Sequence, residues 1–532
     1  MTTRSAAKGT AAVLLLLCAA QFVMTIDSTV MNVSIASLVH DLSTSVTAIQ
    51  LAVTLFTLVM ATTMIAGGKI GDILGRRRTF GIGLVIYAMG SGITAIASNV
   101  IMLYVGWSLL EGLGAALILP TLAALVASNF PGERRPAAYA AIASAASAAM
   151  TLGPLIGGWV TTSFTWRYVF AAEVIVCIGI LVASRVIADA PREGSRPSFD
   201  GVGALLSAGA MGAIVIAALG SSAWGWVVAA EGQPALFGIS LTMWLILAGV
   251  LSAMGFVGWS KRREERGQAP LVSAGLFANK QLLGGLFMLT MQTLIMAGTL
   301  FALPLFFSVA MGLTAFQTGL TLMPMSIGLI ASALWVSQLL IRRGWGPRAI
   351  VRAGLWTVFV ATLLLIAAID IEATSRAMIA PLFVMGAGIG LLAGQLGNVI
   401  QSAVPVERAN EAGGLQYTAQ NLGSSLGTAV IGSLLVAGLT SSIVAQVQAA
   451  PGFTQLQKDK ASVAISENIE FVSDAQLKSG LSKTKATPKQ QAELLAINAE
   501  GRVDALRNGL ATVTLLTVIT LAFTRVLPKK LD

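Results

Sequence analysis

Thr47 to Arg78 have the sequence TAIQLAVTLFTLVMATTMIAGGKIGDILGRRR, in which a long apolar run ends at a short basic segment that contains glycine. Residues 47–68 carry no charged side chain, and about 20 apolar residues suffice for a helix to cross the hydrocarbon core of a bilayer. Backbone exposed to lipid must satisfy its own hydrogen bonds, which leaves helices or closed barrels, and the run lacks the alternation of a barrel strand. The stretch therefore predicts a transmembrane helix followed by a loop that its basic residues hold in the cytoplasm.

Apolar runs of this kind recur along the whole chain of 532 residues. Hydrophobic residues make up 55% of the sequence and charged residues 11%, less than half of the roughly 25% charged residues in soluble domains. A soluble fold could not hide so much apolar surface, so we predict an all-α integral membrane protein with fourteen transmembrane helices. The expected spans are residues 11–34, 47–68, 78–97, 101–126, 137–161, 168–188, 201–221, 235–258, 282–309, 316–340, 350–369, 377–401, 411–438 and 507–526.

The basic residues also predict the orientation in the membrane. Four clusters, at residues 69–78, 134–135, 261–266 and 342–348, fall between spans on the same side as the N-terminus. Because cytoplasmic loops are enriched in lysine and arginine, this side is predicted to be the cytoplasm. We expect a multi-pass protein of the cytoplasmic (inner) membrane with both termini inside the cell.

One polar segment, residues 439–506, is long enough to form a substantial extracellular loop. Within it, Thr487 and Pro488 are typical of a helix start, with threonine as the cap and proline in the first turn. The sequence leaves two interpretations open. The segment is either a small helical or hairpin cap outside the membrane or a loosely ordered loop.

The composition argues against several classes of function. The net charge of +10 is explained by cytoplasmic loops, so we expect no nucleic-acid partner. Cys18 and Cys177 lie in apolar runs and His40 is the single histidine, so we expect neither a disulfide framework nor a metal site. The sequence has no G-K-[ST] of a phosphate-binding loop and no catalytic cluster at one membrane face. We therefore expect no enzyme and no cofactor, and an ion gradient as the driving force of any transport.

The basic segment after the second predicted span has a weak internal echo. Residues 68–78, GKIGDILGRRR, and residues 341–348, IRRGWGPR, are both short, basic and glycine-bearing. A repeat of this kind is typical of transporters with two similar halves. We therefore expect a six-helix half at residues 1–190, an inserted helix pair with cytoplasmic linkers at 191–270, and a second six-helix half at 271–532.

Four motifs give the sequence a family resemblance. Residues 27–33, DSTVMNV, are similar to a first-helix motif D-x-T-V-x-N-V, and residues 68–78 match a loop motif between helices two and three. Residues 153–158, GPLIGG, match a fifth-helix antiporter motif, and residues 166–170, WRYVF, resemble the W-R-W-x-F segment that follows it. Together the motifs resemble the major facilitator superfamily, and within it the fourteen-helix drug:proton antiporters that include quaternary-ammonium and multidrug exporters.

This resemblance implies a fold and an activity. The implied fold is the major facilitator fold, with two six-helix halves and two inserted helices. The implied activity is export of small lipophilic molecules, above all cationic drugs or toxic compounds, in exchange for protons by alternating access. Protons are then the coupling ion, and membrane lipids are the remaining expected partners. An exporter of one endogenous metabolite or of a lipid is the alternative that the residues leave open.

The sequence departs from the family pattern at a few positions. Ala36 replaces the proline after the first-helix motif, and Ala149 replaces the leading glycine of the fifth-helix motif. The fourth-helix motif R-x-x-Q-G has Ser108 in place of arginine and Glu111 in place of glutamine. An account of proton relay that relies on that arginine therefore does not transfer to this chain.

Ionisable side chains inside a membrane are costly, which makes them functional candidates. At 1.5 Å per residue, Glu111 lies about 15 Å into its span, near the midplane, and Asp27 lies about 24 Å along the first span. Burial favours a protonated carboxyl and an arriving cation favours the carboxylate, so we predict that Glu111 and Asp27 couple protons to substrate. A hydrogen bond to a neighbouring helix is the alternative role for Asp27. Glu173 is expected to be a hydrated carboxylate at the outer rim.

Two segments are the predicted conformational elements. By resemblance, the loop after the second span would brace the two halves in the outward-facing state, with a plain basic loop as the alternative. Small residues and a proline in the fifth span would allow close helix approach at the outer gate, with ordinary helix packing as the alternative. The residues concerned are Gly68, Asp72, Gly75, Arg76, Gly153, Pro154, Gly157 and Gly158.

Aromatic, methionine and amide side chains at suitable depth are weaker candidates for a substrate pocket. Such residues suit lipophilic cations through packing and cation–π contact. For any one of them, core packing or contact with lipid is the alternative role. The candidates are Phe22, Trp107, Gln292, Met323, Gln395, Gln416, Tyr417 and Gln420.

Overall fold

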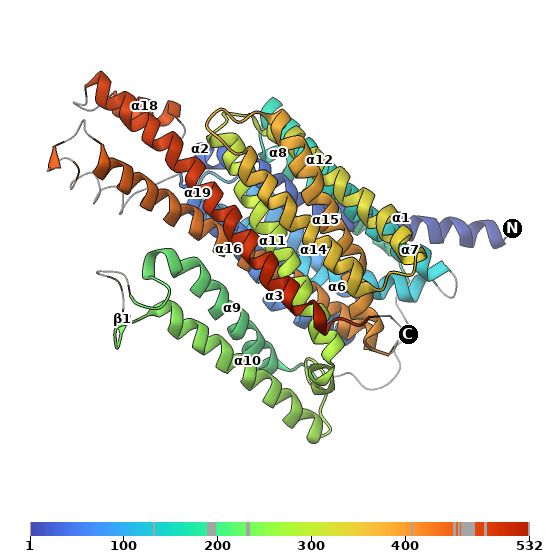
Figure 1. The fold of residues 1–532 in the computed structure, drawn as a ribbon. Helices are drawn as coiled ribbons and strands as arrows, with labels where there is room; N and C mark the ends of the chain where they lie inside the picture. Colours follow the sequence, from blue (N-terminus) through green and yellow to red (C-terminus); the bar gives the residue numbers. More distant parts are fainter. Residues whose placement is uncertain are drawn as a thin grey trace.

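The protein is a bundle of long helices (Figure 1). The computed structural model describes residues 2–130, 134–188, 198–229, 233, 235–405, 408–450, 454–455, 458, 474–482 and 487–529.

The first part of the chain forms the helices at the predicted spans. The bounds are α1 Thr2–Val33, α2 Ile35–Asp41, α3 Val46–Leu74, α4 Arg76–Ala95, α5 Val100–Leu103, the π-helix η1 Tyr104–Glu111, α6 Gly112–Asn129, α7 Arg134–Ser163, α8 Arg167–Ala183 and the 3₁₀ turn η2 Ser184–Val186. Gly75 alone separates α3 from α4. Its φ of 101° lies in the region that glycine adopts without strain, so this residue allows the abrupt reversal at the basic loop.

A helical pair follows at the position of the predicted insertion. Helix α9 spans Gly201–Trp224 and α10 spans Leu241–Glu265, and the strands β1 Ala235–Leu236 and β2 Ile239–Ser240 form a short antiparallel hairpin between them. Figure 1 shows the two helices lying against each other along one flank of the bundle, and α9 also contacts α3 and α16.

The predicted span at residues 235–258 begins too early. Residues 235–240 form the hairpin, because Phe237 and Gly238 both have positive φ and make a turn. The Ser240 side chain then accepts a hydrogen bond from the backbone nitrogen of Thr242 and caps the helix that begins at Leu241.

The rest of the chain forms the second group of long helices. The bounds are η3 Ala274–Ala278, α11 Lys280–Val309, α12 Ala315–Ala331, the π-helix η4 Ser332–Val336, α13 Ser337–Arg342, α14 Pro347–Ala368, α15 Ser375–Ser402, α16 Ala409–Ala449, α18 Asp474–Leu481, α19 Pro488–Phe523 and η6 Thr524–Val526.

Both ends of the predicted extracellular segment at residues 439–506 are helical. Helix α16 continues to Ala449, and the helix that begins at Pro488 is the start of the last long helix, α19, instead of a separate cap (Figure 1). The Thr487 cap itself is confirmed, with a reciprocal hydrogen-bonded pair to Gln490. Residues 459–473 of the predicted loop lie outside the described residues.

One polar residue of the predicted loop segment is packed inside this helical extension. Arg502 of α19 is 2% exposed. Its guanidinium donates to the Asp474 carboxylate at 2.6 Å and to the Val309 backbone carbonyl at 3.3 Å. The contacts of Arg502 therefore hold α18, α19 and α11 together.

Twelve helices in the described part of the chain are long and apolar enough to cross a membrane. The other two predicted spans correspond to α4 and α7, which are helices of 20 and 30 residues. An all-α membrane fold is therefore confirmed, and the count of fourteen spans stays a prediction.

The two groups of helices are in contact at the end of the bundle that carries the α1–α3 and α7–α8 connections. We call this end the outer end, following the predicted orientation. Between α7 and α12, the backbone nitrogen of Phe316 donates to Thr162 Oγ1 at 3.1 Å. Between α3 and α16, Gln50 donates to the Thr428 carbonyl at 3.2 Å, and Ser425 donates to a carbonyl of α3 at 3.0 Å.

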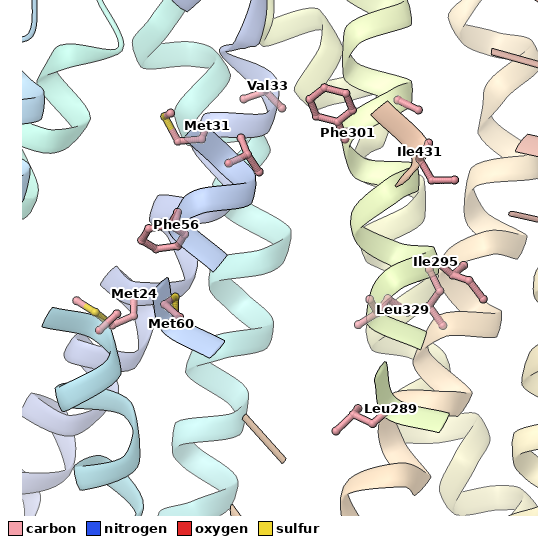
Figure 2. Packing of buried hydrophobic residues seen from close by; sticks show 14 of the residues in the cluster. Met24, Met31, Val33, Phe56, Met60, Leu289, Ile295, Phe301, Leu329 and Ile431 are labelled. Atoms are coloured by element: carbon pink, nitrogen blue, oxygen red, sulfur yellow. The ribbon is translucent and has the colours of Figure 1, made fainter. Parts of the chain in front are cut away.

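Figure 2 shows buried apolar side chains from both of these groups. Met24 and Met60 belong to the first group, and Leu289 and Leu329 belong to the second. All four are less than 10% exposed. Methionine and aliphatic side chains therefore contribute to the buried core in both groups.

The inserted pair is fastened to the second group through Asp200. This carboxylate is fully buried and accepts hydrogen bonds from the Gly203 and Leu271 backbone nitrogens, at 2.9 and 3.1 Å, and from Trp259 Nε1 at 2.9 Å. Arg263 lies 3.6 Å from it.

We expect Asp200→Ala to lower the thermal midpoint of unfolding in detergent markedly. The substitution leaves three buried donors and an arginine without their shared acceptor, a loss of about 3 kcal/mol or more. Glu265→Ala is the matched control, because Glu265 is an exposed acid at the end of α10. Equal midpoints for the two variants would contradict this role of Asp200.

Candidate functional site

Three carboxyl groups meet inside the first group of helices. Asp27 of α1, Glu111 at the end of η1 and Glu173 of α8 each offer one oxygen, and these oxygens lie within 4.8 Å of one another. The three side chains are 0%, 0% and 3% exposed. We call this group the carboxyl cluster.

Helix α4 supplies hydroxyl groups to the cluster from one face. Tyr87, Ser91 and Thr94 are spaced four and three residues apart, which places them on the same side of the helix. Ser91 and Tyr87 donate to Glu173 Oε2 at 3.2 and 3.5 Å, and Thr94 donates to Glu111 Oε1 at 3.1 Å. The spacing of these hydroxyl residues was the signal in the sequence that could have located this site.

The π-helix η1 brings an indole to the cluster. Trp107 Nε1 donates to both carboxylate oxygens of Asp27, at 2.9 and 3.0 Å. The same ring stacks on Phe56 with centroids 4.7 Å apart, so its orientation is fixed from a third helix. Glu111 lies four residues later in the same π-helix, a type of helix that is common at functional sites.

Gly90 allows η1 to lie close against α4. A Cβ atom at Gly90 would come within 2.7 Å of Glu111 Cγ and within 2.6 Å of the Gly106 carbonyl. Ser108, which replaces the family's arginine, donates to the Ala52 carbonyl at 2.8 Å and so serves as a link between helices.

The cluster has no basic partner in the described part of the chain. The four ion pairs recorded among those residues all lie elsewhere. Within the same residues, Glu111 Oε2 and Glu173 Oε1 are buried without a hydrogen-bond partner. Oxygens up to 4.8 Å apart can share one cation at coordination distances of about 2.3–2.6 Å. The arrangement can therefore bind protons or a cation, but a fully ionised cluster would be strongly disfavoured.

One expectation about these acids is wrong. Glu173 is not a hydrated carboxylate at the rim, because it is 3% exposed and hydrogen-bonded to α4. It lies beside Asp27 and Glu111 instead. Depth along a straight helix does not show which side of the helix a residue occupies, and α8 turns Glu173 toward the cluster.

The loop residues predicted to control conformation lie against α6. A Cβ atom at Gly68 would contact Pro120 at 3.5 Å, and Arg76 donates to the Ala124 carbonyl at 3.2 Å. Asp72 is exposed, within electrostatic range of Arg76 and of Glu411 at the start of α16. Asp72 thus faces the second group at the end opposite the outer contacts, and its bracing role stays a prediction.

The glycines of α7 lie at contacts with two different helices. A Cβ atom at Gly153 would overlap Thr29, and one at Gly157 would come within 2.6 Å of Val30, so both glycines allow contact with α1. A Cβ atom at Gly158 would overlap the Ala315 carbonyl of α12. In return, the Pro154 carbonyl lies where a side chain at Gly319 of α12 would be.

The predicted pocket residues lie on several helices of both groups, and their role as a pocket stays a prediction. Phe22 lies in a groove among α1, α7 and α8, and Trp107 belongs to the carboxyl cluster. The amides of the second group are engaged with its own helices. Their contacts are Gln292 to the Ile389 carbonyl at 3.5 Å, Gln395 to Ser337 at 2.7 Å and Gln416 to Gln401 at 3.2 Å. Met323, Tyr417 and Gln420 are half-buried.

The W-R segment closes the outer end of the first group. Trp166 Nε1 and Arg167 Nη1 donate to Asp41 Oδ2 at 3.1 and 3.2 Å, and Arg167 also donates to the Ala97 carbonyl. Burial opposes ionisation of Asp41. Hydrogen bonds from His40 and Trp166, together with the Arg167 charge, nevertheless hold the pKa of that carboxyl below its ordinary value. The segment therefore joins three helix connections, and this contribution weakens only when acid protonates Asp41.

Comparison with known proteins places this arrangement in a family. A profile of the Major Facilitator Superfamily matches residues 17–202 and 198–428. The tetracenomycin C resistance and export protein of Streptomyces glaucescens is 30% identical over 77% of this chain and 73% of its own length. The multidrug efflux pump LfrA of Mycolicibacterium smegmatis is 28% identical over 79% of both chains.

Solved structures show the same fold at low sequence identity. A bacterial homologue of the human lysosomal transporter Spinster, crystallised inward-facing, superposes with a TM-score of 0.58 over 97% of both chains at 13% identity. A D-xylose–proton symporter superposes with a TM-score of 0.56 over 80% of this chain and 90% of its own, also at 13% identity. The predicted family is confirmed by sequence and by fold: the chain belongs to the Major Facilitator Superfamily.

Proposed function

We propose that this protein is a proton-coupled antiporter that exports lipophilic cations from the cytoplasm by alternating access. The observation that carries the proposal is the carboxyl cluster, with three buried acids within 4.8 Å and no basic partner among the described residues. Its relatives support the direction of transport, since they are resistance, export and efflux proteins.

The electrostatics of the carboxyl cluster explain how a cation is exchanged for a proton. Two ionised carboxylates 4.8 Å apart repel each other by roughly 3 kcal/mol at an effective dielectric constant of about 20. A proton or a cation relieves this repulsion. Because either one suffices, an arriving cation displaces a proton, and a proton arriving later displaces the cation. The two fluxes are thereby coupled in opposite directions through one site.

The contacts between helices are the basis of alternating access to the two sides of the membrane. Helices α7 and α12 meet through small residues at the outer end, while Asp72 and Glu411 carry like charges toward each other at the opposite end. This pattern supports an inward-facing state, in which the outer end is closed. The same proposal includes the architecture and the location of the protein. It has two six-helix halves with an inserted helix pair, fourteen transmembrane spans in all, and it lies in the inner membrane with both termini in the cytoplasm.

Transport of tetraphenylphosphonium into inverted vesicles is the direct test. We expect uptake to require an inward-acid pH gradient, to release protons from the lumen and to be indifferent to ATP. Vesicles that lack the protein are the control. Uptake at the same rate after the gradient is collapsed with a protonophore would contradict the coupling.

An exporter of one endogenous metabolite is the second candidate. The relative named for tetracenomycin C favours it, because its printed name gives one compound. The two candidate functions differ in the range of substrates that the protein transports. A multidrug exporter moves several unrelated cations with similar efficiency, and a dedicated exporter moves none of them.

A further inference from the structure

A groove lies on the side of the first helix group, among α1, α7 and α8. It has a volume of about 860 Å³ and is formed by residues such as Phe22, Ile156, Phe164, Tyr168 and Val176. Several of these side chains are exposed although they lie within predicted spans, including Leu15 at 71% and Val176 at 39%. The groove is therefore open toward the lipid instead of toward the space between the two halves.

Glu173 is the single charged residue among those recorded along this apolar groove. The same side chain belongs to the carboxyl cluster, so the groove leads to the cluster directly. Within the described residues, Glu173 Oε1 is buried and has no hydrogen-bond partner. One oxygen of Glu173 is thus held by Ser91 and Tyr87 of α4, while the other has no recorded partner.

The groove is chemically suited to one class of ligand. Aliphatic and aromatic walls accept an apolar body, and the ring faces of Phe22, Phe164 and Tyr168 attract a cation within about 6 Å. A carboxyl at the base complements a single positive charge. Anionic lipid headgroups are disfavoured beside Glu173, and a neutral lipid chain would leave its free oxygen unpartnered.

We propose that this groove is an entry port through which lipophilic monocations pass from the bilayer to the carboxyl cluster, with Glu173 as the first acid that they meet. This inference rests on the proposed function, since it names the route of the exported cations. It assigns to Glu173 a part in substrate recognition.

The natural thiol Cys18 lines the groove and reports directly on occupancy. In proteoliposomes of the Cys177→Ala variant, we expect tetraphenylphosphonium to slow labelling of Cys18 by N-phenylmaleimide at least tenfold. The neutral analogue triphenylphosphine oxide should protect much less, and Glu173→Gln should abolish the difference between the two compounds. Equal protection by both compounds, or unchanged protection in Glu173→Gln, would overturn the port.

Transport through a filled groove supplies a second readout. Ala172 lies in the groove and Ile175 of the same helix does not, although both are exposed. We expect Ala172→Trp to raise the KM for tetraphenylphosphonium at least tenfold with little change in kcat, while Ile175→Trp behaves as wild type.

The two proposals fail in different ways. If export of tetraphenylphosphonium depends on the pH gradient but Ala172→Trp exports it with an unchanged KM, the port is wrong and the antiporter stands. If export by the wild type ignores the gradient, the antiporter is wrong, and the labelling of Cys18 still decides whether cations occupy the groove.

Discussion

Replacing Glu111 with glutamine should abolish gradient-driven export of tetraphenylphosphonium. Glutamine keeps the shape of the side chain and can still accept the hydrogen bond from Thr94 Oγ1. It cannot release a proton or carry the charge that attracts a cation. Unit charges about 5 Å apart attract each other by roughly 3 kcal/mol at a dielectric constant near 20. Losing this attraction corresponds to about a hundredfold loss of transport efficiency.

Proton release on cation binding provides the decisive measurement for Glu111. In detergent with a pH indicator, wild-type protein should release protons when tetraphenylphosphonium is added, and Glu111→Gln should release far fewer. Export of neutral substrates should be reduced less than export of cations. Glu372→Gln serves as the control, because Glu372 is an exposed acid between α14 and α15. Release of wild-type size in Glu111→Gln would transfer the coupling role to Asp27.

Gly158→Val should arrest transport by holding the outer end open. The glycine lies against the backbone of α12, where a Cβ atom would come within 2.9 Å of Phe316 Cα and overlap the Ala315 carbonyl. Backbone atoms cannot move aside as a flexible side chain can, so α7 and α12 must separate. Because alternating access requires the outer end to close in each cycle, we expect at least a tenfold loss of export.

Thiol accessibility distinguishes this arrest from misfolding. Thr428 of α16 is 2% exposed and its carbonyl accepts a hydrogen bond from Gln50 across the outer contact. In Thr428→Cys protein without Cys18 and Cys177, a membrane-impermeant maleimide applied from outside should react faster when Gly158→Val is present. Gly258→Val is the matched control, because a Cβ atom at Gly258 of α10 meets nothing within 4 Å. Unchanged labelling together with normal export would contradict the gating role.

The membrane class, the helix positions and the family could all be predicted from the sequence. Each depends on local properties. The apolar composition of residues 47–68 alone is sufficient for a transmembrane helix. Gly75 permits the chain to reverse direction through its own backbone conformation. The Thr487 cap is formed within one helical turn. What the sequence left open depended on tertiary contacts. Whether residues 439–506 form a helical cap or a loosely ordered loop could not be decided locally, because the partner of Arg502, Asp474, lies in another helix.

The tertiary structure alone decided which acids lie together. Sequence placed Asp27 and Glu111 inside the membrane, but a helix places its residues at every angle, and depth does not reveal direction. Packing of α1, η1 and α8 around the hydroxyl face of α4 brought Glu173 into the cluster and gave Asp27 the indole of Trp107 as its donor. Which residues of a helix are buried depends on the helices that pack against it. The carboxyl cluster and the groove beside it therefore exist only in the folded bundle.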